Sequence, residues 1–289
     1  MKATLDCLEC VARQTLRVAR LASADADVQR RIFDEVIATI PGMDLEVSPA
    51  VLSLVCYRVA SEMSGTKDPY EREKKEQNAL ALELEPELRE MLQVSDDPLS
   101  TALHLAAAGN IIDLGTMKTE NIDIRATIKE VLAQRFAVDH TPRLRESLER
   151  CDDLLFFLDN AGEIVFDKLL IEELMKRTKV TAVVKAGPIL NDALLSDAED
   201  VGLTKVCEVV DNGGAFVGSP LGLISKETLE RMERADVIIG KGQGNYETID
   251  EHLGDIYLIL RAKCEVIAQH MGVKLGQVAL ISTRTRREG

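Results

Sequence analysis

The chain has 289 residues, of which 46% are hydrophobic and 29% charged, the balance of an ordinary globular protein. Its 35 basic and 49 acidic residues give a net charge of −14, and it has no Trp, so both the charge and the scarcity of aromatic rings disfavour nucleic-acid binding. No apolar run reaches the roughly 18–20 residues of a membrane span, and the first residues lack the apolar core of a signal peptide. We therefore expect a cytoplasmic protein that binds neither nucleic acid nor membrane.

Residues 1–148 have the hydrophobic periodicity of helices and few strand signals. Three pairs of residues have the form of a helix start, because a capping side chain followed by Pro suits the first helical turn. These pairs are Ser48-Pro49, Asp68-Pro69 and Asp97-Pro98. We therefore expect about four or five helices in this region.

From residue 149 to 289, short apolar runs alternate with amphipathic stretches. The predicted strands are 154–158, 180–184, 206–210, 237–240 and 278–282, and the predicted helices are 163–177, 190–199, 223–234 and 255–271. Such alternation is typical of a parallel sheet with helices on both faces. We therefore predict an α/β fold: a Rossmann-like three-layer α/β/α domain over 149–289 with a mostly parallel sheet, and an all-helical cap domain over 1–148.

Polar residues gather where the first two predicted strands end, which is where open α/β sheets bind their ligands. They are Asp159, Asn160, Glu163, Lys185, Asn191 and Asp192. Two carboxylates and an amide oxygen are ligands suited to Mg²⁺ or Mn²⁺. An Asp-Asn pair before a helix is also an ordinary capping turn, so this pattern alone leaves both interpretations open.

A glycine-rich segment, 240–247, follows the fourth predicted strand. Its glycines allow backbone N–H groups to approach a phosphate, and Lys241 adds positive charge. The segment matches neither the Walker pattern nor GxGxxG at a first strand. In the helical half, Asn110 and Asp113 either face the strand ends or mark the end of a helix near Gly109. By pattern alone, Lys263 lies in the last predicted helix and is solvated.

Cys7 and Cys10 form a CxxC pair at the start of the chain, while the other four cysteines lie in apolar stretches. A structural zinc site needs four ligands, and the sequence has no second CxxC and no pair of His at ligand spacing. Metal binding, redox chemistry and a purely structural role all remain open for this pair.

Together, segments 159–163, 185–192 and 242–247 resemble the DUF89 family, the ARMT1-like damage-control phosphatases. The Cys7–Cys10 pair, segment 109–113 and Lys263-Cys264 resemble its prokaryotic and archaeal subfamily. The similarity extends over nearly the whole chain. It implies a helical region on a Rossmann-like domain, and a metal-dependent phosphatase that hydrolyses sugar phosphates or damaged phospho-metabolites.

The resemblance also implies roles for particular residues. It implies a divalent metal (Mg, Mn, Co or Ni) bound by Asp159, Asn160 and Asp192, and a phosphate contact from Lys263. We take Asp159 and Asp192 as the candidate catalytic residues. The candidate substrate-binding residues are Asn110, Glu163, Lys185, Asn191, Gly242, Asn245 and Lys263.

The resulting hypothesis is that water attacks a phosphate monoester of a small metabolite directly, while the phosphate lies between the metal, Lys263 and the backbone of 242–244. An aspartyl-phosphate formed on Asp159 is an alternative mechanism. Two other functions fit the same pocket: a non-catalytic sensor that uses Cys7 and Cys10, and an S-adenosylmethionine-dependent methyltransferase. The sequence pattern specifies neither the natural substrate nor the oligomeric state.

Overall fold

The computed structural model describes residues 1–111 and 134–284. Its centre is a six-stranded sheet of order β3-β2-β1-β4-β5-β6. The strands are β1 (Asp153–Phe157), β2 (Lys179–Val184), β3 (Glu208–Asp211), β4 (Val237–Lys241), β5 (Ile256–Arg261) and β6 (Val278–Ser282). Strands β1 to β5 are parallel, and β6 pairs antiparallel with β5. The predicted Rossmann-like α/β fold with a mostly parallel sheet is therefore confirmed.

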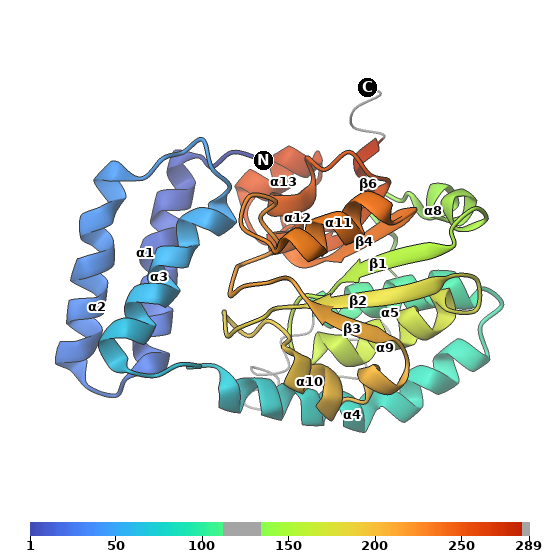
Figure 1. The fold of residues 1–289 in the computed structure, drawn as a ribbon, viewed down its shortest axis with the longest axis horizontal. Helices are drawn as coiled ribbons and strands as arrows, with labels where there is room; N and C mark the ends of the chain where they lie inside the picture. Colours follow the sequence, from blue (N-terminus) through green and yellow to red (C-terminus); the bar gives the residue numbers. More distant parts are fainter. Residues whose placement is uncertain (112–133, 285–289) are drawn as a thin grey trace.

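Helices cover both faces of this sheet (Figure 1). One face carries α4 (Glu71–Gln93), α5 (Pro98–Ile111), α8 (Thr141–Leu148), α9 (Glu163–Leu174) and α10 (Leu195–Asp200). The other face carries α11 (Lys226–Arg234), α12 (Gly242–Ile249) and α13 (Glu265–Met271). Because β1, β2, β4 and β5 are packed on both faces, they are almost continuously apolar, as buried parallel strands require.

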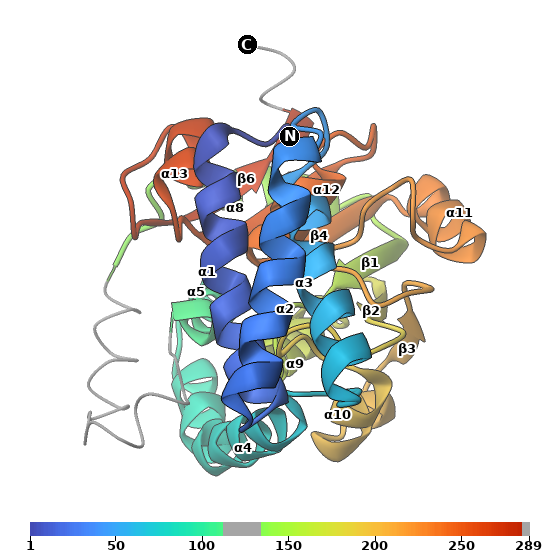
Figure 2. The same cartoon turned by 90° about the vertical axis from the view of Figure 1, so that its left-hand side faces the viewer.

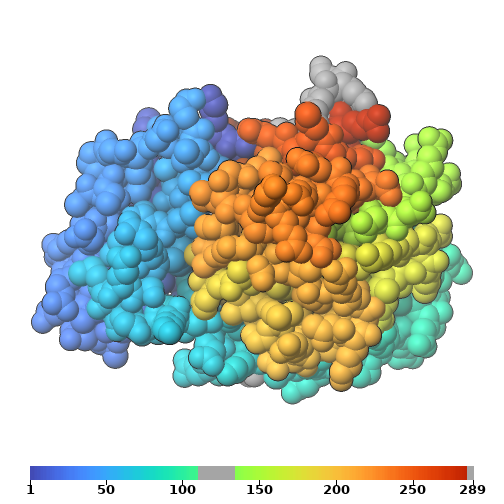
Figure 3. All heavy atoms as spheres, in the orientation of Figure 1, coloured from blue at the N-terminus to red at the C-terminus, as the bar shows by residue number. Residues whose placement is uncertain are grey.

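A separate bundle of α1 (Leu5–Ala22), α2 (Ala26–Thr39) and α3 (Pro49–Ser64) lies beyond one edge of these layers, and Figure 2 shows its helices side by side. The bundle has a core of its own, which includes Val11, Ile32 and Cys56. The predicted start of α3 is confirmed, because the Ser48 side chain accepts a hydrogen bond from the backbone N–H of Val51. In the space-filling view of Figure 3, the bundle lies directly beside the surface that runs from α10 to α11.

The helices that precede the sheet do not all belong to this bundle. Helix α5 packs mainly against α9, and α4 packs against both α9 and α5, so residues 71–111 are attached to the sheet layer. The Asp97-Pro98 start is capped as expected, since Asp97 accepts from the N–H of Ser100. The domain boundary after residue 148 stays a prediction.

The prediction of one long helix over 255–271 is wrong. Residues Ile256–Arg261 form strand β5 in the middle of the sheet, and helix α13 begins only at Glu265. A short run of consecutive apolar residues does not distinguish a buried strand from a buried helix, because neither shows a period. Lys263 therefore lies in the loop after a strand rather than in a helix. None of the described helices is both long and apolar enough to cross a membrane.

Candidate active site

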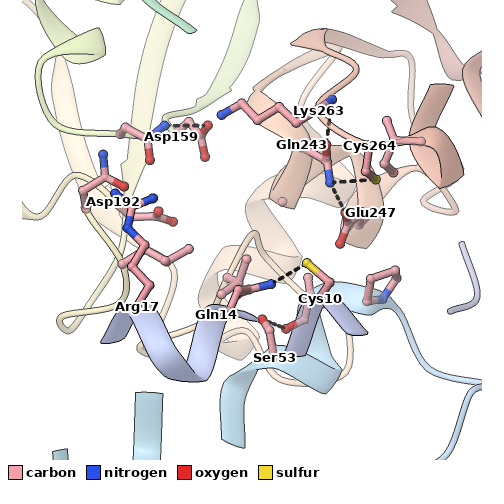
Figure 4. A pocket seen from close by; sticks show the side chains of 18 of the residues that line it. Cys10, Gln14, Arg17, Ser53, Asp159, Asp192, Gln243, Glu247, Lys263 and Cys264 are labelled. Carbon is pink, nitrogen blue, oxygen red and sulfur yellow. Dashed lines mark hydrogen bonds between the residues drawn. The ribbon is translucent and has the colours of Figure 1, made fainter. Parts of the chain in front are cut away.

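A cavity of about 700 Å³ lies between the bundle and the carboxyl ends of the strands (Figure 4). We call one side the strand-end wall; it consists of Asp159, Asn160, Glu163, Asn191 and Asp192. We call the side formed by the first helix the α1 wall; it consists of Cys7, Cys10, Gln14 and Arg17. Lys263, Cys264 and Glu247 line the cavity between these walls.

Backbone hydrogen bonds join the β1–α9 loop to the β2–α10 loop. The N–H of Ala161 donates to the carbonyl of Asn191, and the N–H of Ala193 donates to the carbonyl of Asp159, both at 2.8 Å. These bonds form an antiparallel bridge between Asn160 and Asp192, which lies just beyond the parallel pairing of β1 and β2. The adjacent residues Asp159 and Asn160 therefore share one wall with Asp192, which lies far from them in the sequence.

Asp159 and Asp192 are both buried, with 7% and 2% of their surface exposed. Burial raises the pKa of each carboxyl above its ordinary value, repulsion from Glu163 adds to this effect for both, and repulsion from Asp159 adds to it for Asp192. Lys185 acts in the opposite direction: its Nζ lies 3.6 Å from Asp192 Oδ2. Burial and repulsion therefore disfavour the charged forms of Asp159 and Asp192 more than the nearby lysines favour them.

Asn160 is oriented by the acidic groups on each side of it. Its amide nitrogen donates to Asp159 Oδ2 at 3.1 Å and to Glu163 Oε1 at 2.6 Å. Because both N–H groups are used in this way, the amide oxygen is the atom available as a ligand.

Behind this wall lies a buried ion-pair cluster of Lys241, Asp167 and Glu163. Lys241 Nζ is 2.6 Å from Asp167 Oδ1 and 3.4 Å from Glu163 Oε2, and Lys241 and Asp167 are 0% exposed. Burial opposes the charge on Lys241, but the two acids outweigh it and raise the Lys241 pKa. The position of Lys241 in the glycine-rich segment predicts positive charge for a phosphate. In the structure, Lys241 is instead paired with protein carboxylates behind the wall.

Gly242 packs directly against the Asp159 carboxylate, where a Cβ atom would collide with the carboxylate oxygens. Its φ of +77° also suits only glycine well. Segment 242–249, expected to begin as a phosphate loop, is helix α12.

Three predicted substrate-binding residues lie behind the cavity instead of lining it. Lys185 Nζ donates to the carbonyl of Gly218 at 2.7 Å, and the Asn245 amide donates to the carbonyls of Leu158 and Lys241. Gly242 is the third, for the steric reason above. These residues contact protein groups and support the wall, and their role in substrate binding stays a prediction.

Glu163, Asn191 and Lys263 do line the cavity, as predicted. The Lys263 side chain is exposed, extends toward Asp159 in Figure 4, and its charge lowers the Asp159 pKa. Its backbone N–H donates to Gln243 Oε1 at 3.3 Å. The Asn110 side chain and Asp113 lie outside the described residues, although neighbouring Gly109 reaches the cavity.

Sequence reasoning missed the polar surface of the α1 wall. Tyr57 donates to Gln14 Oε1 at 2.6 Å, and Gln14 Nε2 in turn donates to Cys10 Sγ at 3.1 Å. The spacing of Cys7, Cys10, Gln14 and Arg17 by three and four residues was a usable signal, because it marks one face of a helix. All six cysteines are free thiols, and the role of the CxxC pair stays open.

Glu247 was missed as well. It lines the cavity although only 5% exposed, and burial raises its pKa to about 7, against the opposing effect of a 2.8 Å hydrogen bond from Gln243. It also accepts a backbone hydrogen bond from Ala50 of α3, which places it at the junction of bundle and sheet.

Comparison with known proteins agrees with this geometry. Residues 3–278 match the family model described as the damage-control phosphatase ARMT1-like domain. The chain belongs to this family. The predicted family is therefore confirmed.

Several known proteins are similar to this chain over nearly their whole length. A damage-control phosphatase of Pyrococcus horikoshii is 32% identical over 99% of both chains, and one of Archaeoglobus fulgidus is 32% identical over 96% of this chain and 98% of its own. An uncharacterized protein of Methanocaldococcus jannaschii is 35% identical over 96% of this chain and 94% of its own. The crystal structure of a DUF89 family protein from Pyrococcus horikoshii superimposes with a TM-score of 0.90 at 29% identity, covering 98% and 99% of the two chains.

Proposed function

We propose that this protein is a metal-dependent phosphatase that hydrolyses phosphate monoesters of small metabolites, such as sugar phosphates or damaged phospho-metabolites. The observation that carries the proposal is the pairing of two buried carboxylates on the strand-end wall with the cationic Lys263, which lines the same cavity. Membership of the damage-control phosphatase family supports the reaction class.

The strand-end wall suits a divalent cation. Asp192 Oδ2 has no hydrogen-bond partner among the described residues, and the Asp159 carboxylate and the Asn160 amide oxygen lie on the same wall. The described residues hold no group of three or more His, Cys, Asp and Glu placed for a metal, so two carboxylates and an amide are the proposed ligands. Hard oxygen donors of this kind suit Mg²⁺, Mn²⁺, Co²⁺ or Ni²⁺.

When bound, such a cation neutralises charge that develops on the phosphoryl oxygens. Lys263 binds the phosphate from the other side and, because its side chain is exposed and flexible, follows the group as its geometry changes. Asp159 orients the attacking water and accepts its proton, since its carboxylate is directed into the cavity (Figure 4). Gly242 gives the carboxylate room to do so. As the new P–O bond forms, the ester P–O bond breaks, and the leaving oxygen takes up a proton from water, so the products are the alcohol and inorganic phosphate.

The α1 wall encloses the rest of the substrate. Gln14 and Arg17 present hydrogen-bond donors toward the space opposite the phosphate, so we assign them to recognition of the metabolite. The proposal includes location in the cytoplasm and no nucleic-acid or membrane partner, in keeping with six free thiols and a net charge of −14.

The test is phosphate release from p-nitrophenyl phosphate and a panel of sugar phosphates, after chelation and then with each divalent metal restored. Asp192→Asn keeps the shape of the side chain but removes its charge. Because changes merely next to metal ligands cost about 10–100-fold, we expect at least about a hundredfold loss of kcat/KM in this variant. Asp6→Asn removes an exposed carboxylate from the rim of the same cavity and should leave turnover nearly unchanged.

Release that is independent of added metal, or full activity of Asp192→Asn, would contradict the proposal. Tight binding of a phosphorylated metabolite without turnover under any metal would instead favour a sensor.

A further inference from the structure

One face of α4 buries polar residues where apolar ones would be expected. Lys74, Gln77 and Asn78 are only 3%, 6% and 3% exposed, although they lie in a strongly charged stretch of sequence. They continue the helix face that buries Ala81, Leu84 and Leu88 further along α4. Burial of a polar group is costly unless the group has a hydrogen-bond or ion-pair partner, so each of these three side chains needs one.

Asn78 contacts one of the loops that carry the candidate metal ligands directly, and the other through Asp197 of α10. Its Oδ1 accepts a 2.7 Å hydrogen bond from the backbone N–H of Gly162, in the β1–α9 loop beside Asn160. Its Nδ2 donates to Asp197 Oδ1 at 2.8 Å. Asp197 in turn accepts from the N–H of Leu194 at 2.9 Å, at the end of the β2–α10 loop that carries Asp192. One amide, together with Asp197, therefore ties the two loops together in addition to their backbone bridge.

Two neighbours on α4 reinforce this connection. Lys74 Nζ is 2.8 Å from Asp68 Oδ2 and 3.6 Å from Asp197 Oδ2, so it balances the charge of the carboxylate that Asn78 binds. Gln77 Oε1 accepts a long hydrogen bond of 3.4 Å from Asn191, the residue before Asp192.

The polarity of the site specifies an amide at position 78. Gly162 offers only an N–H donor and Asp197 only acceptor oxygens, so the side chain must accept on one side and donate on the other. A carboxylate would face Asp197 with a second negative charge, and an apolar side chain would remove the partner of the Gly162 N–H and of Asp197 Oδ1. Asn78 does not line the cavity itself.

We propose that Asn78 is a positioning residue, which sets the separation of the β1–α9 and β2–α10 loops and thereby the distance between Asp159 and Asp192. This inference rests on the proposed function for its catalytic consequence. The helical half of the chain then contributes to the metal site without supplying a ligand.

The first experiment compares Asn78→Ala with Glu76→Ala, an exposed change on the same helix. Isothermal titration calorimetry with Mn²⁺ gives the metal affinity, and p-nitrophenyl phosphate gives kcat and KM. We expect Mn²⁺ to bind at least about tenfold more weakly to Asn78→Ala, with a fall in kcat, and to bind Glu76→Ala as it binds the wild type. A folded Asn78→Ala protein with the Mn²⁺ affinity of the control would overturn the inference.

A polarity exchange separates positioning from general destabilisation. Asn78→Asp alone places two carboxylates against each other, so we expect weak Mn²⁺ binding. Adding Asp197→Asn restores one donor and one acceptor across the contact, while Lys74 keeps a carboxylate neighbour. The double variant should regain most of the lost affinity; affinity no better than that of Asn78→Asp would count against the proposal.

Hydrogen exchange tests the same link without metal or substrate. In Asn78→Ala, the backbone amides of 159–163 and 191–197 should exchange faster together, while those of the bundle remain unchanged. If the wild type neither binds Mn²⁺ nor releases phosphate, the proposed function fails, but this comparison still decides whether Asn78 links the loops. Unchanged exchange in both segments would refute the link.

Discussion

The two walls of the cavity differ in how their polar groups are held. On the strand-end wall, Asp159, Asp192 and Glu163 are buried, and ion pairs or hydrogen bonds hold them in place. On the α1 wall, Arg17 is exposed and its ion pair with Glu73 is a loose 3.7 Å. The rigid strand-end wall therefore suits the chemistry that is common to many phosphate esters. The more adaptable α1 wall suits recognition of a particular metabolite.

This comparison also separates two kinds of energetic cost. Changes to the strand-end wall leave charges buried without partners, which is expensive. A change to the exposed Arg17 of the α1 wall leaves no charge buried without a partner, so it costs little. The predictions below test this difference, from the largest expected effect to the smallest.

Lys241→Met should have the largest effect on stability, because it leaves Asp167 and Glu163 buried without their cation. We expect the free energy of unfolding to fall by about 3–5 kcal/mol in urea denaturation with a chelator present. Lys226→Met removes a lysine whose side chain is 90% exposed and should change it by less than about 0.5 kcal/mol. Equal effects of the two variants would show that Lys241 does not stabilise the buried carboxylates of Asp167 and Glu163.

Glu247 lies at the junction of the two walls and should make stability depend on pH. Its pKa is about 7 in the folded protein, against an ordinary 4.5, so its stabilising contribution is complete below about pH 4.5 and is lost as the pH rises through 7. Glu247→Gln has no carboxyl to titrate. Between pH 5 and 8, its free energy of unfolding should therefore decline by about 3 kcal/mol less than that of the wild type. Thermal and urea unfolding across this range, with chelator, provide the measurement.

The exposed Glu9 supplies a matched control on α1, since Glu9→Gln should retain the pH dependence of the wild type. A Glu247→Gln protein with that same dependence would indicate that the Glu247 carboxyl titrates normally.

Arg17→Ala should have the smallest effect, and it should change KM instead of the free energy of unfolding. Loss of an exposed cation is worth about 0.2–1 kcal/mol, so we expect KM for the preferred substrate to rise by no more than about fivefold. The value of kcat and the thermal stability should stay as they are. Arg20→Ala, an exposed change on α1 outside the cavity, is the control. A loss of kcat in Arg17→Ala would move this residue from recognition to the chemical step.

The sequence was most informative where chemistry requires a particular residue at a strand end. Asp159, Asn160 and Asp192 could be predicted because the alternation of strands and helices identifies the carboxyl ends, and these ends meet at one edge of a parallel sheet. Lys263 could be identified only by family resemblance, because the apolar strand before it was interpreted as a helix. A consecutive apolar run has no period to indicate otherwise.

Residues that act through others were harder to predict. Lys241 and Lys185 are the same residue type as Lys263, yet both are buried and paired with carboxylates, which only their three-dimensional surroundings show. The polar face of α4 did leave a signal. Lys74 and Asn78 fall on the extension of the helix's apolar stripe, where a solvated charged run would not place them.

The backbone bridge between Asn160 and Asp192 has a consequence for the dimensions of the metal site. The bridge is antiparallel, unlike the parallel pairing of β1 and β2, and its two backbone hydrogen bonds fix the separation of the two ligand loops. Exchanges of core side chains can therefore tilt or crowd the site, but they leave this separation unchanged while both hydrogen bonds remain. Selectivity among cations of different radius must then come from the side-chain rotamers of Asp159 and Asp192, not from the frame that carries them.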